Sequence, residues 1–328
     1  MDTLANLRVE NLASTNDKMS RCLKLAALAA KSEVPVLILG ETGTGKTLLG
    51  RAIHNSSARA GSPFISFNAS AMSDTLLESQ LFGHERGAFT GAEKAVKGKF
   101  ELADKGTLFL DELADMSLLA QAKILRAIEY GEFERLGSER LLRSNARVIS
   151  ATNCSLREKI REGKFREDLF HRLNGLTLVI PALRDRADEL PALIAAELKA
   201  SAFAAGKKIT AIHPAAMEAL LAHEWRGNLR ELKHLVRTMT LFCEASVILP
   251  EDVIFPPDLD SAEPNPIGHK PGGVPADKCP QDLALSGAVE RHIRFVYEQN
   301  NRNQRQTAKR LGISRATLAR HLRNMAQS

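Results

Sequence analysis

The chain has 328 residues, 44% of them apolar, and a net charge of +6, which suits two or three domains with at least one sizeable core. It has no apolar run of roughly 18 residues and no amino-terminal cleavage signal, so we expect no membrane association, no secretion and a place in the cytoplasm. The scattered cysteines (Cys22, Cys154, Cys243 and Cys279) argue against a zinc site and a disulfide framework.

A glycine-rich segment follows the apolar run Val34–Leu39. It reads Gly40, Glu41, Thr42, Gly43, Thr44, Gly45, Lys46, Thr47, which is the spacing of a phosphate-binding loop. The glycines let successive backbone N–H groups face phosphate oxygens, Lys46 can neutralise the outer phosphates, and the Thr47 hydroxyl can bind Mg²⁺. The alternative is an ordinary glycine-rich turn between a strand and a helix. Chance rarely produces the full phosphate-binding spacing, which disfavours this alternative. We predict that this segment binds ATP with Mg²⁺.

Short apolar runs alternate with helical patterns through residues 1–185. The runs are Val34–Leu39, Phe64–Phe67, Thr107–Leu110, Arg147–Ala151 and Leu176–Ile180. Their alternation with helices predicts an α/β core, a parallel sheet covered by helices.

The third apolar run ends in two carboxylates, Asp111 and Glu112, which a parallel sheet would place at the same edge as the phosphate-binding loop. Asp111 would hold the magnesium shell, and Glu112 would orient or deprotonate the attacking water. On its own, a strand that ends in Asp-Glu is more often a capped turn, but the preceding phosphate-binding loop favours catalysis. We also assign the whole run to nucleotide binding: Ala103, Asp104, Lys105, Gly106, Thr107, Leu108, Phe109, Leu110, Asp111 and Glu112.

Two other strand ends carry amides, Asn68 and Asn153, at the edge where a γ-phosphate would lie. Either amide could sense that phosphate or simply make a turn. Arg166 and Arg172 lie on a helical pattern further along the chain, where each could be an ordinary surface cation.

From residue 186 to residue 255 the pattern is wholly helical and predicts a helical lid. Its segments are Asp188–Ala205, Pro214–His223 and Asn228–Phe242. Residues 256–285 carry seven of the thirteen prolines, which predicts a linker.

The last 43 residues, 286–328, hold nine Lys/Arg and two acids, whereas the rest of the chain is close to neutral. Within them, residues 303–322 read as a helix, a glycine turn at Gly312, a Ser cap and a second helix, which predicts a helix-turn-helix domain. The basic charge favours binding to double-stranded DNA over a purely structural helical hairpin or a solvated helix surface. The candidate DNA contacts are Arg305, Ser314, Arg315, Ala316, Thr317 and Arg320.

The most specific motif is the hexapeptide Gly87, Ala88, Phe89, Thr90, Gly91, Ala92, which follows Glu78–Arg86. Taken alone it is a surface turn with one exposed ring and one hydroxyl. Together with the phosphate-binding loop and the acid pair, it makes the chain resemble the AAA+ ATPases that activate sigma-54 RNA polymerase, from about Leu12 to Ser328. Thr47 stands where the family usually has an acid.

This resemblance implies roles for residues of the core and the lid. The hexapeptide would contact the sigma factor, Glu112 would be the catalytic acid, and Asn68 would hold it inactive until nucleotide and partner are in place. Asn153 would lie in the first sensor and Arg230 in the second. Arg166 and Arg172 would act on a neighbouring subunit's nucleotide, so the family's hexameric ring is expected. The tail resembles the Fis-type domains of these activators.

The resemblance implies an ATP-hydrolysing activator that binds upstream enhancer DNA and remodels the closed complex of sigma-54 and RNA polymerase. Because the core starts within about twenty residues of Met1, as in the phage-shock activator type, we expect control by a separate inhibitory or signalling protein. Two alternatives remain open: a repressor of the same family with a vestigial motor, and an AAA+ remodeller of another kind.

Overall fold

The structure is a computed structural model that describes residues 6–70, 72–255, 293, 296–297, 303–311, 318–319 and 322. Contacts divide the chain into two compact units, residues 1–258 and 259–328. None of the helices in the described ranges is long and apolar enough to span a membrane.

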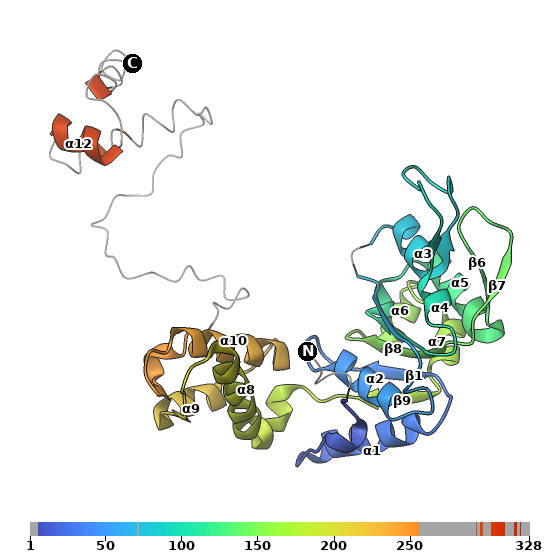
Figure 1. Ribbon diagram of the computed structural model, residues 1–328, viewed down its shortest axis with the longest axis horizontal. Coiled ribbons are helices and arrows are strands. Elements are labelled where there is room, and N and C mark those ends of the chain that lie inside the picture. Colours follow the sequence, from blue (N-terminus) through green and yellow to red (C-terminus); the bar gives the residue numbers. More distant parts are fainter. Residues whose placement is uncertain are drawn as a thin grey trace. The chain divides into compact units, whose positions relative to one another are not determined.

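The first unit is built on a five-stranded parallel sheet (Figure 1). Its strands are β1 (Val36–Leu39), β2 (Phe64–Asn68), β5 (Thr107–Asp111), β8 (Arg147–Thr152) and β9 (Leu176–Val179). The strand order is β2-β5-β8-β1-β9, and every neighbouring pair is parallel. All five predicted strands are therefore confirmed, and their carboxyl ends meet at one edge.

Alternate residues of the strands enter two different cores, because successive side chains of a strand point to opposite faces. Val36 and Ile38 pack with the residues of one face, which α1 (Asp17–Ala30) and α2 (Lys46–Asn55) cover, and Leu37 packs on the other. The remaining helices of the core unit are α3 (Asp74–Phe82), α4 (Lys99–Leu102), α5 (Leu118–Tyr130), α6 (Leu156–Arg161), α7 (Glu167–Leu173), η1 (Val9–Asn11) and η2 (Leu113–Asp115). Helices on both faces account for the continuous apolar character of the strands.

Two hairpins extend from the core beside one another (Figure 1). One pairs β3 (Gly83–His84) with β4 (Val96–Lys97), and the other pairs β6 (Glu132–Glu134) with β7 (Leu141–Arg143). Leu136 joins them, since its N–H donates to the carbonyl of Gly83 (3.0 Å) and its carbonyl accepts from Glu85 N (3.0 Å). The hexapeptide 87–92 lies in the first hairpin.

The lid consists of η3 (Leu183–Glu189), α8 (Leu190–Ala205), α9 (Pro214–Ala222), α10 (Asn228–Phe242) and η4 (Pro250–Asp252). The three predicted helical segments are present, and their apolar faces enclose the buried Trp225. The prediction of a wholly helical lid is wrong, because β10 (Ala211–Ile212) pairs in parallel with β11 (Val247–Ile248). The two strands follow α8 and α10, and their backbone groups bond to each other. A strand of two residues is too short to give a periodic pattern of apolar residues in the sequence.

In the second unit, α12 (Gln304–Leu311) begins after Asn303, whose side chain accepts from Gln306 N (3.2 Å) as a helix cap does. Ala308 is buried with Ile293 and Leu318, and the partly buried Leu322 packs against them. The turn at Gly312 and most of the following helix lie outside the described residues, so the helix-turn-helix stays a prediction.

Candidate functional site

The phosphate-binding loop, residues 40–47, connects β1 to α2 at the carboxyl edge of the sheet. Gly43 has φ +83° and Gly45 has φ +100°, conformations that a side chain would make costly. The N–H groups of the first turn of α2 have no partner within the helix, and residues 45–48 of that turn line a pocket of about 260 Å³. The loop thus has the free donors that an anion needs.

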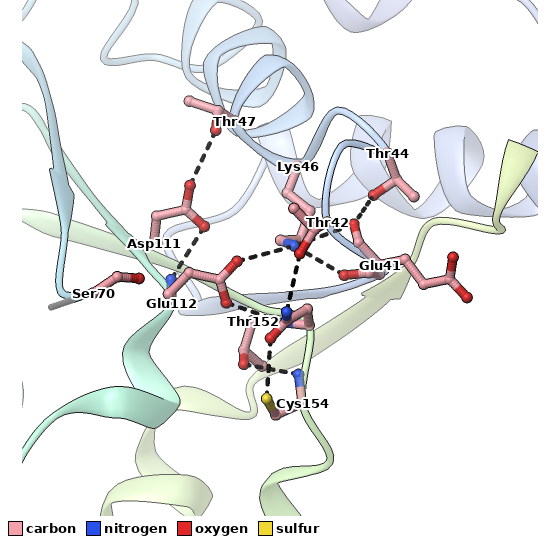
Figure 2. A network of polar contacts seen from close by, with 12 residues as sticks. Glu41, Thr42, Thr44, Lys46, Thr47, Ser70, Asp111, Glu112, Thr152 and Cys154 are labelled. Atoms are coloured by element: carbon pink, nitrogen blue, oxygen red, sulfur yellow. Dashed lines mark hydrogen bonds and ion pairs between the residues drawn. The ribbon is translucent and has the colours of Figure 1, made fainter. Parts of the chain in front are cut away.

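Lys46 is buried beneath the loop, with 6% of its surface exposed. Its Nζ donates to the carbonyls of Gly40 (2.9 Å) and Glu41 (3.3 Å) and lies 3.5 Å from Glu112 Oε1 (Figure 2). A cation held among oxygens next to a pocket is suited to phosphate oxygens entering that pocket.

Asp111 and Thr47 face each other across the pocket, since Thr47 Oγ1 donates to Asp111 Oδ2 at 3.3 Å (Figure 2). The other carboxylate oxygen of Asp111 accepts from Glu112 N (3.1 Å). One hydroxyl and one carboxylate oxygen are the hard ligands that Mg²⁺ takes together with phosphate oxygens and water, so these residues fit a nucleotide-bound magnesium ion.

Glu112 has φ +50° and ψ +45°, a left-handed conformation that is costly for a residue with a side chain. Asn153 N donates to its Oε2 (3.3 Å), and Lys46 lies on its other oxygen. The backbone thus turns sharply after β5 and sends this carboxylate into the pocket. Such a strained conformation at a strand end is typical of functional sites.

The structure bonds one predicted sensing amide to the phosphate-binding loop and the other to its own turn. Asn153 Nδ2 donates to Thr42 Oγ1 of the phosphate-binding loop (3.0 Å), and Asn153 Oδ1 accepts from Cys154 Sγ (3.0 Å). Asn68 ends β2 as expected, but its Oδ1 accepts from Ser70 N (2.8 Å), which is the turn-making alternative. Within the described residues, Asn68 makes no hydrogen bond to Glu112.

The lid supplies one wall of the pocket through Leu229, Arg230 and Lys233 of α10. Arg230 therefore lines the pocket, and its role in a second sensor stays a prediction. Lys233 was missed by sequence reasoning, although it lies one turn beyond Arg230 and so on the same helix face.

Part of the run assigned to nucleotide binding lies elsewhere. Ala103, Asp104, Lys105 and Gly106 precede β5 at the amino edge of the sheet, where Gly106 contacts Pro63. A five-residue strand spans about 16 Å, so they lie at the end of β5 opposite to Asp111. Thr107, Leu108, Phe109 and Leu110 are fully buried in β5. Only Asp111 and Glu112 of this run line the pocket, so nucleotide contact by the other eight stays a prediction.

The two predicted trans-acting arginines are absent from the pocket lining of their own chain. Arg166 directly precedes α7 and pairs with Asp168 (2.7 Å), whose carboxylate raises the pKa of the Arg166 guanidinium. Arg172 is exposed and donates to the carbonyl of Ile128 (3.3 Å). A role for either arginine at a neighbouring subunit's nucleotide stays a prediction.

The hexapeptide 87–92 forms a turn closed by a hydrogen bond from Gly87 N to the Ala92 carbonyl (2.9 Å). The Phe89 ring is half-buried against His84, edge to face at 5.0 Å, so the expectation of an exposed ring is wrong. Thr90 is exposed at the turn. Ala88 touches Gly137 of the second hairpin, where a Cβ would lie 2.8 Å from the Ala88 Cβ.

The structure describes only one of the six predicted DNA contacts. Arg305 lies in α12, and Ser314, Arg315, Ala316, Thr317 and Arg320 lie outside the described residues.

Two family profiles match the chain. The family described as "Sigma-54 interaction domain" matches residues 12–179, and that described as "AAA+ ATPase lid domain" matches residues 184–268. The first match contains the phosphate-binding loop, both acids, the hexapeptide and both candidate trans-acting arginines.

Several known proteins are similar to the chain over nearly its whole length. The "Regulatory protein AtoC" of Escherichia coli is 40% identical over 94% of this chain and 66% of its own length. The "Nif-specific regulatory protein" of Azotobacter vinelandii is 39% identical over 94% of this chain and 58% of its own. The chain thus spans less than two thirds of these curated relatives.

Solved structures of NtrX from Brucella abortus share the fold. The complex with ADP has a TM-score of 0.69 at 32% identity and covers 96% of this chain and 68% of the NtrX chain. The complex with ATP has a TM-score of 0.68 at 31% identity and covers 98% and 71%.

Proposed function

Since the chain belongs to the family of sigma-54-dependent transcriptional regulators with a sigma-54 interaction domain and an AAA+ lid, we propose that it hydrolyses ATP to remodel the closed complex of sigma-54 and RNA polymerase. The observation that carries this proposal is the pocket in which the phosphate-binding loop, Asp111, Glu112 and the lid cations meet. NtrX, which shares the fold, has been crystallised with ATP and with ADP.

In the proposed reaction, the backbone donors at the start of α2 and the ammonium of Lys46 hold the phosphates. Thr47 and Asp111 would hold Mg²⁺, which neutralises charge on the phosphate oxygens when bound. Glu112 orients the attacking water and accepts its proton, and its contact with Asn153 N keeps the carboxylate at the pocket. Arg230 and Lys233 add positive charge from the lid side.

The positions of Arg166 and Arg172 support assembly into a ring, with six subunits in this family. Both cations lie outside the pocket of their own chain, so each is available to a neighbouring subunit's nucleotide. A cation supplied in this way stabilises the charge that develops in phosphoryl transfer.

Three partners complete the proposal. The turn 87–92 would contact sigma-54, with the exposed Thr90 hydroxyl at its tip. The basic segment 286–328 would bind enhancer DNA through a helix-turn-helix. A separate inhibitory or signalling protein would control the ring in the cytoplasm.

The proposal is tested by three substitutions, each scored for ATP binding, ATP hydrolysis and open-complex formation at a sigma-54 promoter. Lys46→Ala should abolish ATP binding, because the outer phosphates lose their cation. Glu112→Ala should bind ATP but lower turnover by about 10²-fold or more, because the attacking water loses its base. Thr90→Ala should hydrolyse ATP normally and fail to open the promoter.

Normal promoter opening by Thr90→Ala would contradict the remodelling claim. A wild-type protein that binds upstream DNA and represses without hydrolysing ATP would favour a repressor with a vestigial motor. Hydrolysis without binding to sigma-54 in a trapped nucleotide state would favour an AAA+ remodeller of another class.

A further inference from the structure

The side chain of Glu41 extends away from Lys46 and Glu112 (Figure 2), and its carboxylate bonds to the lid. Its carboxylate accepts from both terminal nitrogens of Arg184, one at 2.9 Å, and from Asn228 Nδ2 at 3.1 Å. Its carbonyl meanwhile accepts from Thr44 Oγ1 (2.8 Å) and Lys46 Nζ (3.3 Å). One residue therefore braces the loop through its backbone and binds the lid through its side chain.

Asn228 is the lid residue at the centre of these contacts. It is fully buried, and its φ of +53° is a left-handed conformation that Asn tolerates better than most residues. Its Oδ1 accepts from Leu183 N (2.7 Å), and its Nδ2 also donates to the carbonyl of Thr42 (3.1 Å). The strained backbone at the start of α10 is thereby fixed to the loop and to the segment that leads into the lid.

The position of α10 decides where the lid cations lie, because Arg230 and Lys233 belong to its first two turns. The lid backbone also packs directly on the loop, since a Cβ on Gly43 would lie 2.2 Å from the carbonyl oxygen of Gly227. A small displacement of α10 would move both cations away from the pocket wall.

A carboxylate next to a phosphate site is unfavourable in itself, since like charges repel. The Glu41 carboxylate is compensated by Arg184, and hydrogen bonds from Arg184 and then Asn228 lower its pKa to about 2. The group is thus ionised and bound to the lid at neutral pH. Glu41 therefore favours nucleotide binding only if its contacts with the lid stabilise the bound state by more than its repulsion of the phosphates destabilises it.

We propose that Glu41 is a positioning residue, which holds Arg230 and Lys233 over the nucleotide through Arg184 and Asn228. This inference rests on the proposed ATP site. It assigns the side chain of Glu41 to the placement of the lid and not to contact with a phosphate.

The test measures equilibrium binding of a fluorescent, non-hydrolysable ATP analogue to the full chain. Glu41→Gln and Arg184→Met should each weaken binding by about three- to tenfold, the size of an ordinary coupling between contacting residues. The double variant should bind the analogue with the same affinity as the single variant that binds it less tightly, because both changes break the same contact. Circular dichroism of every variant establishes that it is folded.

The decisive measurement repeats Glu41→Gln in a chain that already carries Arg230→Ala and Lys233→Ala. If Glu41 acts through these cations, the added change should alter binding by less than about twofold. The matched control is Glu197→Gln, which breaks a carboxylate–guanidinium contact within the lid, to Arg237 (3.2 Å), away from the phosphate-binding loop. It should leave nucleotide binding unchanged.

Two results would overturn the inference. One is unchanged affinity for the analogue in Glu41→Gln, and the other is an equally large drop in affinity when Glu41→Gln is added to the chain that carries Arg230→Ala and Lys233→Ala. These results are distinct from failure of the ATP site itself. A wild-type chain that binds no analogue, or a Lys46→Ala chain that binds it normally, would refute the proposed function, whereas normal binding by wild type and by Glu41→Gln would refute only the role of Glu41.

Discussion

At the scale of single residues, the site combines strained and tightly bonded groups. Glu112 has a left-handed backbone, and its carboxylate lies between Lys46 and Asn153 N. Asn153 is itself held on two sides, by Thr42 and by the thiol of Cys154. Asn68 faces its own turn instead. The role of Asn68 as a switch, which the resemblance implies, therefore stays a prediction.

The first prediction concerns Cys154. In a Cys279→Ser background, N-ethylmaleimide should modify Cys154 before the other thiols, because Cys22 and Cys243 are buried and burial raises the pKa of Cys22 to about 11. Modification should lower kcat by about two- to tenfold, the cost of one hydrogen bond that orients Asn153. Peptide mass mapping and ATPase assays measure both effects. Cys154→Ser should keep normal turnover when it is treated with N-ethylmaleimide. If the treatment lowered the kcat of Cys154→Ser as much as that of the chain with Cys154, the result would contradict this role.

The second prediction concerns the pH dependence of the Glu41 contacts. Because the pKa of Glu41 is lowered from 4.5 to about 2, its stabilisation of the fold is fully present above pH 4.5 and is lost as pH falls towards 2. Wild type should therefore melt at a higher temperature than Glu41→Gln at pH 7, and the difference should shrink at pH 3. Other carboxylates titrate in both proteins and cancel in the comparison. A difference that grows on acidification would contradict the assignment.

At the scale of elements, packing decides more than local propensity. The short hairpins β3–β4 and β6–β7 lie together because Leu136 bonds to both, and the half-buried Phe89 ring is held against His84. Helix α2 lies so close to β5 that a Cβ on Gly50 would be 2.5 Å from the Phe109 ring. These contacts link the strand that carries Asp111 to the helix that carries Lys46.

The third prediction follows from that close approach. Helix propensity alone would make Gly50→Ala stabilising by about 1 kcal/mol. We expect it to lower the free energy of unfolding by about 1–2 kcal/mol instead, because the Phe109 ring is fully buried and cannot move without cost. Urea denaturation measures the change. Gly61→Ala, with nothing within 4 Å of its Cβ, should stay within about 0.5 kcal/mol of wild type. A more stable Gly50→Ala would mean that the ring adapts freely.

At the scale of the whole molecule, the predicted catalytic groups lie in separate regions of the chain. The pocket contains the phosphate-binding loop, two acids and two lid cations, whereas Arg166 and Arg172 lie elsewhere on the core. Catalysis in the proposed ring would need both surfaces, so activity would belong to the assembly.

The fourth prediction tests this directly by mixing inactive variants. Glu112→Gln and Arg172→Ala should each be inactive alone, and an equal mixture should recover roughly a quarter of wild-type ATPase activity, since about one site in four pairs an intact pocket with an intact arginine. A mixture of Glu112→Gln with Lys46→Ala should stay inactive, because every subunit then has a damaged pocket. Failure of the first mixture in a protein that still forms rings would argue against Arg172 as a trans-acting group.

The sequence alone determined the five strands of the main sheet, the three main helices of the lid and most of the site, because these features are local. Apolar runs predicted all five strands, and the spacing of residues 40–47 and of Asp111–Glu112 predicted the two halves of the pocket that strand topology brings together. Tertiary structure alone decided which residues of 103–112 reach the pocket, that Asn68 bonds to its own turn, and that Phe89 packs on His84. It alone placed Lys233 in the wall and joined Glu41 to Arg184 across 143 residues of chain. Such contacts depend on how separate elements pack, and no local pattern in the sequence records the partner of a side chain.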